Sequence, residues 1–152
     1  MGLKLHYNPL STFSRRVLIT FAEKQIAHEL VVVDMAARQH RQQPYLSLNP
    51  YGRVPTLQED DFILFESIAI LNYLEATRPT PPLVPADARG RALVDMHMKL
   101  CDLQLSVMPT RAAAPCTCSS RIWPMGVGHS AKQAIIVSMA SSLNRIRKLD
   151  FQ

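Results

Sequence analysis

Apolar and polar residues along the first third of the chain predict a strand, a helix and a second strand. Residues 3–7 alternate in type and end at an Asn-Pro turn, as a short strand does. Residues 14–24 place apolar side chains at helical spacing, which predicts an amphipathic helix. Residues 28–33 contain a valine-rich run that favours a buried strand in a sheet covered on both faces. The three elements form a βαβ unit.

The following segments predict a hairpin and another helix. Residues 54–57 and 62–65 are short apolar runs joined by four polar residues, which indicates two antiparallel strands. Residues 67–75 carry apolar side chains on one helical face. Residues 36–48 are polar and interrupted by a proline, so we expect an irregular helix there. The order βαβ and then ββα is the topology of a thioredoxin-like α/β domain.

A proline-rich stretch separates this domain from a helical one. Residues 78–88 hold four prolines, which cannot donate backbone hydrogen bonds, and we expect a linker. Residues 89–107 and 131–149 carry apolar side chains every three or four positions, as amphipathic helices do. We therefore expect a thioredoxin-like domain over residues 1–77 and an incomplete all-α domain over residues 89–152. The apolar stripe of the first helix in the second domain is Leu93, Met96, His97, Leu100, Leu103 and Val107.

Composition favours a folded cytoplasmic protein. Hydrophobic residues make up 47% of the 152 residues, which suffices for a core. No apolar stretch is long enough to cross a membrane, and the N-terminus has the pattern of a strand that contains Lys4 rather than of a secretion signal. Cys101, Cys116 and Cys118 lack the spacing of a zinc site or a disulfide framework, so we expect a reducing compartment and no metal. We interpret His97 as an ordinary helix residue.

The net charge of +5 comes from one part of the chain. Residues 1–108 hold 11 basic and 11 acidic side chains, whereas residues 109–152 hold six basic side chains and Asp150. A basic tail of this kind is more typical of a solvated helix face than of a nucleic-acid surface. We therefore expect no nucleic-acid partner.

Val54-Pro55 opens a predicted strand, where proline removes a ladder hydrogen bond. A cis peptide bond would explain the proline. In such a turn the residue before proline exposes its N–H and C=O to one side, where an extended peptide can pair with them. The alternative interpretation is an ordinary turn proline.

Glu66 and Ser67 lie where a predicted strand gives way to a helix. The free N–H groups and positive dipole end of that helix suit a carboxylate ligand. The Ser67 hydroxyl can donate to the same carboxylate, and Glu66 can pair with an ammonium group. The alternative is that Ser67 only caps the helix and Glu66 is only a favourable first-turn acid.

Three stretches of the chain resemble the glutathione transferase superfamily, most closely its Ser-type classes such as phi and related bacterial forms. They are NPLSTFSRRV at residues 8–17, NPYGRVPTL at residues 49–57 and FESIAILNYL at residues 65–74. The resemblance covers residues 1–108. It implies glutathione as co-substrate and no further cofactor.

The resemblance also implies how glutathione is held. Val54, with Pro55 behind it, would bind the cysteinyl part, and Glu66 with Ser67 would bind the zwitterionic γ-glutamyl end. Basic residues would contact the glycine carboxylate and neighbouring groups, because charge-assisted hydrogen bonds stabilise more than neutral ones. These residues are His40, Arg41 and Arg53. The alternative is that the three are solvated surface groups.

Ser11 matches the catalytic serine of the phi-type pattern, in Pro9-Leu10-Ser11. It would donate a hydrogen bond to the glutathione sulfur and stabilise the thiolate, not act as a nucleophile. Thr12 and Ser14 are competing hydroxyls, and Ser14 is expected to cap the first helix. No cysteine occurs in residues 8–17, which argues against the classes that form mixed disulfides at this turn.

The resemblance further implies an electrophile pocket and a dimer. Leu10, Phe13, Leu105 and Met108 would contribute to a pocket for a small hydrophobic electrophile, and Tyr51 would insert into the neighbouring subunit of a homodimer. The helical domain is shorter than the family pattern.

Three functions follow as hypotheses. The first is conjugation of glutathione thiolate to small electrophiles, with peroxide reduction as a related activity. The second is a glutathione-dependent isomerase or dehydroascorbate reductase. The third is a non-catalytic glutathione-binding or protein-interaction module.

Overall fold

The computed structural model describes residues 2–105, which fall into two compact units divided after Pro81. The division lies within the proline-rich stretch at residues 78–88. The helix expected at residues 131–149, Met108, Cys116 and Cys118 lie outside the described residues.

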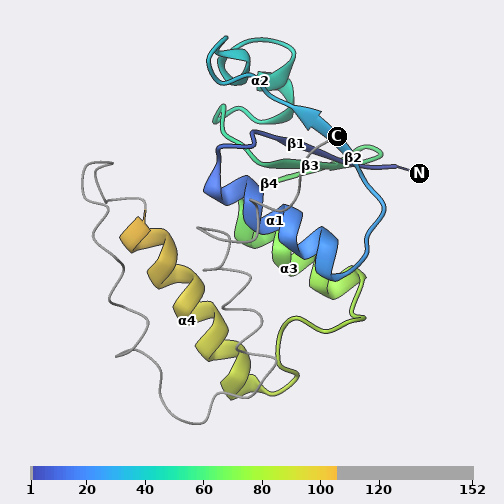
Figure 1. Ribbon diagram of the computed structural model, residues 1–152, viewed down its shortest axis with the longest axis vertical. Coiled ribbons are helices and arrows are strands. Elements are labelled where there is room, and N and C mark those ends of the chain that lie inside the picture. The colour runs from blue at the N-terminus through green and yellow to red at the C-terminus, as the bar shows by residue number, and fades with distance from the viewer. Residues whose placement is uncertain (1, 106–152) are drawn as a thin grey trace. The chain divides into compact units, whose positions relative to one another are not determined.

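The first unit is built on a four-stranded mixed sheet, shown in Figure 1. Its strands are β1 (Leu3–Tyr7), β2 (Glu29–Val32), β3 (Thr56–Glu59) and β4 (Phe62–Phe65), in the order β2-β1-β3-β4. The pair β1 and β2 is parallel, whereas β3 pairs antiparallel with both β1 and β4. This arrangement confirms the predicted βαβ then ββα topology.

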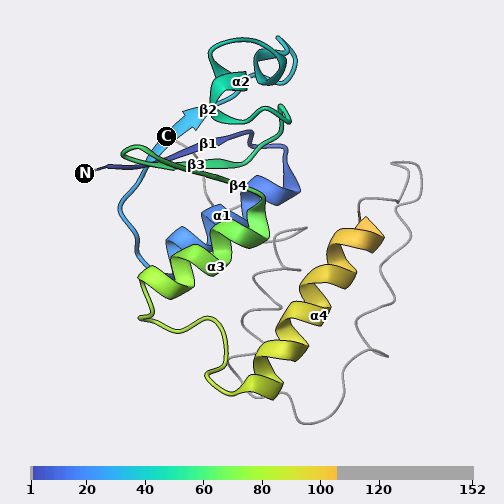
Figure 2. The same cartoon turned by 180° about the vertical axis from the view of Figure 1, so that it is seen from behind.

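Two helices cover one side of this sheet. Figures 1 and 2 show α1 (Thr12–Glu23) and α3 (Ser67–Thr77) side by side below the sheet and α2 (Tyr45–Leu48) on the other side. Inward-pointing side chains of β1 and β3 meet the apolar stripes of both helices. The fully buried members of this core are Leu5, Val17, Phe21, Leu57, Ile70 and Leu74. Burial of each such side chain stabilises the fold by about 1.5 to 3 kcal/mol.

The prediction that residues 28–33 form a strand buried on both faces is wrong. β2 is an edge strand of the sheet, and it presents Leu30 and Val32, 36% and 56% exposed, to solvent. Valine-rich sequence suits any pleated strand, so it does not specify a central position in the sheet.

The irregular helix expected at residues 36–48 is confirmed. The chain forms a 3₁₀ turn η1 (Gln39–Arg41) and then the single turn α2, with a cis peptide bond before Pro44 between them. The polar composition of the segment offers too few apolar positions for a longer packed helix.

The described part of the second unit contains α4 (Ala88–Leu105). Its buried side chains are Val94, His97, Met98 and Cys101, whereas Met96, Leu100 and Leu103 of the predicted stripe are exposed. The predicted stripe is thus only partly right: His97 is buried, but the other buried positions lie on a neighbouring face of the helix. The His97 Nδ1 atom lies 2.6 Å from the Leu93 carbonyl oxygen one turn earlier, as in an ordinary helix residue. Within residues 2–105, no helix has the length and apolar character needed to cross a bilayer.

Candidate functional site

Ser11 lies in the tight loop that leads from β1 into α1. Its Oγ accepts a hydrogen bond from the Ser14 backbone N–H at 3.2 Å, so Ser11 is the N-cap of α1. The prediction that Ser14 caps this helix is therefore wrong. Ser14 is buried one turn further on, where its Oγ accepts from the Asn8 N–H at 3.4 Å. Because the cap uses only an acceptor lone pair, the Ser11 hydroxyl proton is left to donate to a ligand.

Three hydrogen bonds hold the loop before Ser11 in place. The Asn8 side chain donates to the Val33 carbonyl at 3.0 Å and accepts from the Leu10 N–H at 3.0 Å. Arg15 Nε donates to the Pro9 carbonyl at 2.8 Å, so this arginine supports the loop from the first turn of α1. Ser11 therefore stands on a fixed backbone at the positive end of a helix dipole.

The Val54-Pro55 peptide bond is cis, as predicted. Pro55 is buried and Val54 is partly exposed. Within the part of the chain that the structure describes, no hydrogen bond to the Val54 N–H or C=O is found. Both groups remain available to a peptide backbone.

The start of α3 places Glu66 and Ser67 next to each other with different roles. Glu66 is the N-cap, with a left-handed φ of 72°, and its exposed side chain makes no capping bond. Ser67 is the first helical residue and is 5% exposed, so it does not serve as the cap. No hydrogen bond to the Ser67 hydroxyl is found among residues 2–105. The hydroxyl and the first N–H groups of α3 form a group of donors suited to a carboxylate.

The loop at residues 49–53 lies directly against η1. Gly52 has a φ of +58°, and a Cβ added there would stand 2.5 Å from the His40 carbonyl oxygen and 3.2 Å from Arg41 Cδ. This close approach brings His40 and Arg41 beside the segment that carries Arg53. The buried Nδ1 of His40 has no hydrogen-bond partner in the described residues. The arginines at 41 and 53 are exposed.

The predicted electrophile pocket is only partly described. Leu10 is 82% exposed, and the partly buried Phe13 ring lies 5.0 Å from the Arg16 guanidinium carbon. Leu105 ends α4, but its side chain and Met108 lie outside the described residues, so the pocket stays a prediction.

Tyr51, the predicted dimer contact, is 66% exposed, and its ring packs at 5.6 Å from the Phe65 ring. Among the described residues, no group of three or more His, Cys, Asp or Glu side chains is placed to hold a metal ion.

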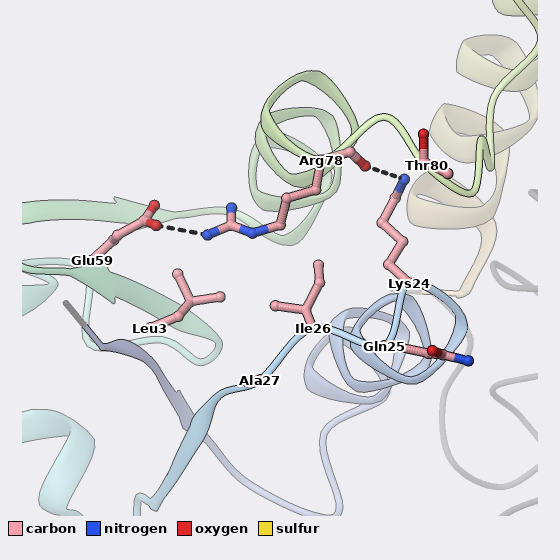
Figure 3. A pocket seen from close by; sticks show the side chains of 8 residues that line it. All are labelled: Leu3, Lys24, Gln25, Ile26, Ala27, Glu59, Arg78 and Thr80. Carbon is pink, nitrogen blue, oxygen red and sulfur yellow. Dashed lines mark hydrogen bonds and ion pairs between the residues drawn. The ribbon is translucent and has the colours of Figure 1, made fainter.

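A hollow at the opposite end of the sheet is shown in Figure 3. Its charged residues satisfy one another. Arg78 binds Glu59 at 2.7 Å, and the buried Lys24 ammonium binds Glu75 at 2.7 Å and two backbone carbonyls. We therefore assign these charged residues a role in holding the fold together and do not regard the hollow as a second ligand site.

Sequence reasoning missed a buried polar cluster behind Val54. Tyr45, Asn49 and Thr56 are 6%, 2% and 0% exposed and are hydrogen-bonded to one another. Burial raises the pKa of Tyr45, although hydrogen bonds from Thr56 and Asn49 act in the opposite direction. The signal in the sequence was Thr56, a hydroxyl inside the short apolar run at residues 54–57.

Comparisons with known proteins agree on this first unit. Residues 10–77 match the family described as glutathione S-transferase, N-terminal domain. The glutathione S-transferase PARB of Nicotiana tabacum is 47% identical over 74 residues, which cover 49% of this chain and 35% of that protein. A glutathione S-transferase of Hyoscyamus muticus is 44% identical over 102 residues, or 66% of this chain and 48% of that protein. The chain thus spans less than half the length of each of these relatives.

Solved structures of glutathione transferases also align with this chain. Glutathione transferase F7 from Populus trichocarpa aligns with a TM-score of 0.60 and 39% identity over 64% of this chain and 47% of that one. Human glutathione transferase theta-2, solved with glutathione and an unknown ligand, aligns with a TM-score of 0.63 and 39% identity, over 65% of this chain and 41% of that one.

Proposed function

We propose that the chain, whose N-terminal domain belongs to the glutathione S-transferase superfamily, binds glutathione and transfers its thiolate to small hydrophobic electrophiles. The transfer would proceed by substitution or by conjugate addition. Peroxide reduction by the same thiolate is a related expectation.

The Ser11 hydroxyl is the observation that carries this proposal. A thiol with a pKa of about 8.5 is mostly protonated near neutral pH, and the thiolate is the nucleophile. Lowering that pKa by about two units requires roughly 2.7 kcal/mol of selective stabilisation of the anion. The free hydroxyl proton of Ser11 and the N-terminus of α1 both act in that direction.

The remaining candidates suit the rest of a γ-linked tripeptide. The unpaired Val54 backbone suits an extended cysteinyl residue, and Ser67 with the start of α3 suits the γ-glutamyl carboxylate. Glu66 offers a charge to the ammonium group. His40, Arg41 and Arg53, close together around Gly52, suit the glycine carboxylate.

We propose a homodimer in the cytoplasm as the working state. The exposed ring of Tyr51, backed by Phe65, is the kind of rigid aromatic anchor that protein interfaces favour. Such a dimer would be checked by sedimentation of the wild type and of Tyr51→Ala.

The deciding experiment measures the thiol pKa of bound glutathione. The full chain is saturated with glutathione, and thiolate absorbance is followed across neutral pH. We expect ionisation well below the value for free glutathione, together with turnover of a chlorinated nitroaromatic substrate. Binding with an unshifted thiol and no turnover would instead support a non-catalytic binding module.

A further inference from the structure

The peptide bond between Arg53 and Val54 is held by two buried donors. The Tyr45 hydroxyl donates to the Arg53 carbonyl oxygen at 2.5 Å, and Asn49 Nδ2 donates to the same oxygen at 2.9 Å. A single carbonyl oxygen can accept both bonds, since it has two lone pairs.

The donors themselves are fully used, which fixes the direction of each bond. Asn49 Nδ2 gives its second proton to Thr56 Oγ1 at 3.2 Å. The Tyr45 proton goes to Arg53, so the 2.9 Å contact between the Thr56 and Tyr45 hydroxyls must have Thr56 as donor. The Asn49 side-chain oxygen accepts from the Tyr51 N–H at 3.1 Å. A buried network that is satisfied in this way is rigid, because any rotation leaves a polar group unpaired.

Holding the Arg53 carbonyl determines where the Val54 N–H points. The Arg53-Val54 peptide is not among the cis bonds of the described residues, so its C=O and N–H point in opposite directions within one plane. The carbonyl is directed inward to Tyr45 and Asn49. The N–H of Val54 is therefore directed away from the cluster, where no partner is found in residues 2–105.

We propose that Tyr45 and Asn49 are positioning residues of the glutathione site, which orient the Val54 N–H for the cysteinyl backbone by fixing the Arg53 carbonyl. This inference rests on the proposed function. It adds a buried layer behind the residues that would touch glutathione, and it assigns a role to polar groups that a purely structural core would replace with apolar ones.

The test removes one hydroxyl at each end of the same domain. Tyr45→Phe deletes the donor to Arg53, whereas the matched control Tyr73→Phe deletes a hydroxyl that donates to Glu59 at 2.6 Å. Both variants lose one hydrogen bond, so both should show a comparable fall in Tm. Tyr45→Phe alone should raise the glutathione Kd by about three- to tenfold, the equivalent of one hydrogen bond. KM for glutathione should rise with kcat almost unchanged, because none of the hydrogen bonds of the cluster found in the described residues involves Ser11.

The outcomes separate the two proposals. Wild-type protein that fails to bind glutathione overturns the proposed function, and this inference with it. Wild-type binding with the same Kd in both variants overturns the inference alone. If Tyr45→Phe does not fold, Thr56→Val replaces it: this near-isosteric change removes the donor to Tyr45 and should raise Kd by a smaller factor, and an unchanged Kd there also overturns the inference.

Discussion

The Ser11 hydroxyl oxygen accepts the Ser14 backbone N–H at 3.2 Å, which ties the candidate catalytic group to the first turn of the helix that follows it. One atom thus holds a structural bond and still carries a proton for a ligand. Stability and catalysis should therefore respond differently to substitutions at this position.

Ser11→Ala should lower kcat/KM by about 100-fold, because one donor to developing negative charge is lost. The same change should cost about 1 kcal/mol of stability through the missing cap. Ser11→Thr keeps both functions and should restore most of the activity. Ser14→Ala serves as the matched control, since it removes a buried hydroxyl of the same turn and should reduce stability without this loss of rate. Equal turnover in Ser11→Ala and wild type would contradict the assignment.

Glu66→Gln should raise the glutathione Kd by about tenfold, because a charge-assisted bond to the γ-glutamyl ammonium is lost. Titration calorimetry gives the value. Glu23→Gln, at the exposed end of α1, is the control and should bind normally. A glutathione analogue without the α-amino group should bind wild type and Glu66→Gln with the same Kd. If the two Kd values still differ, Glu66 does not act on the ammonium group.

Lys24→Met should destabilise the protein by about 3 to 5 kcal/mol, since it removes a buried ammonium from its 2.7 Å ion pair with Glu75 and from two backbone carbonyls. Urea denaturation measures the loss. Lys4→Met is the control, because its ion pair with Glu29 at 3.2 Å is exposed and should contribute less than about 1 kcal/mol. The double variant Lys24→Met with Glu75→Leu should recover much of the stability, and no recovery would argue against an ion-pair role.

The stability of the protein at acid pH should depend on Glu59. Hydrogen bonds from Tyr73 and then from Arg78 lower the pKa of this carboxyl below its ordinary value of 4.5. A lowered folded-state pKa stabilises the fold above the unfolded pKa, and this contribution disappears as pH falls through the folded one. The Tm difference between wild type and Glu59→Gln should therefore be constant at neutral pH and shrink as pH falls below 4.5. A Tm difference that stays the same across this pH range would show that protonation of Glu59 is not coupled to unfolding.

Local signals in the sequence were enough for the topology and for the cis bond before Pro55. Alternating residues, helical spacing and proline chemistry act within a few positions of each other, so they can be read without coordinates. The exposure of Leu30 and Val32 could not be read in this way, because the place of a strand in a sheet depends on the other strands.

In the candidate site, too, local motifs could be predicted from the sequence, whereas contacts between distant residues could not. Motif residues such as Ser11, Glu66 and Ser67 were found from the sequence, but which serine caps α1 was not, since Ser11 and Ser14 are both good capping residues. Tyr45 and Asn49 were missed because they matter through a hydrogen bond that each donates to the Arg53 carbonyl. The periodicity of the sequence gives no sign of such a shared contact. The buried face of α4 was only partly predicted, because apolar residues recur at helical spacing on two neighbouring faces of that helix.

Gly52 has a consequence for how this domain can vary. Its backbone is left-handed, and a Cβ added there would stand 2.5 Å from the His40 carbonyl oxygen. The position therefore has no room for a side chain of any size. A substitution there would not remove a functional group, yet it would push the turn with His40 and Arg41 outward and widen the span between two basic groups and Val54. Under the proposed function, such a substitution would change the spacing of the groups that would hold the cysteinyl and glycine parts of glutathione.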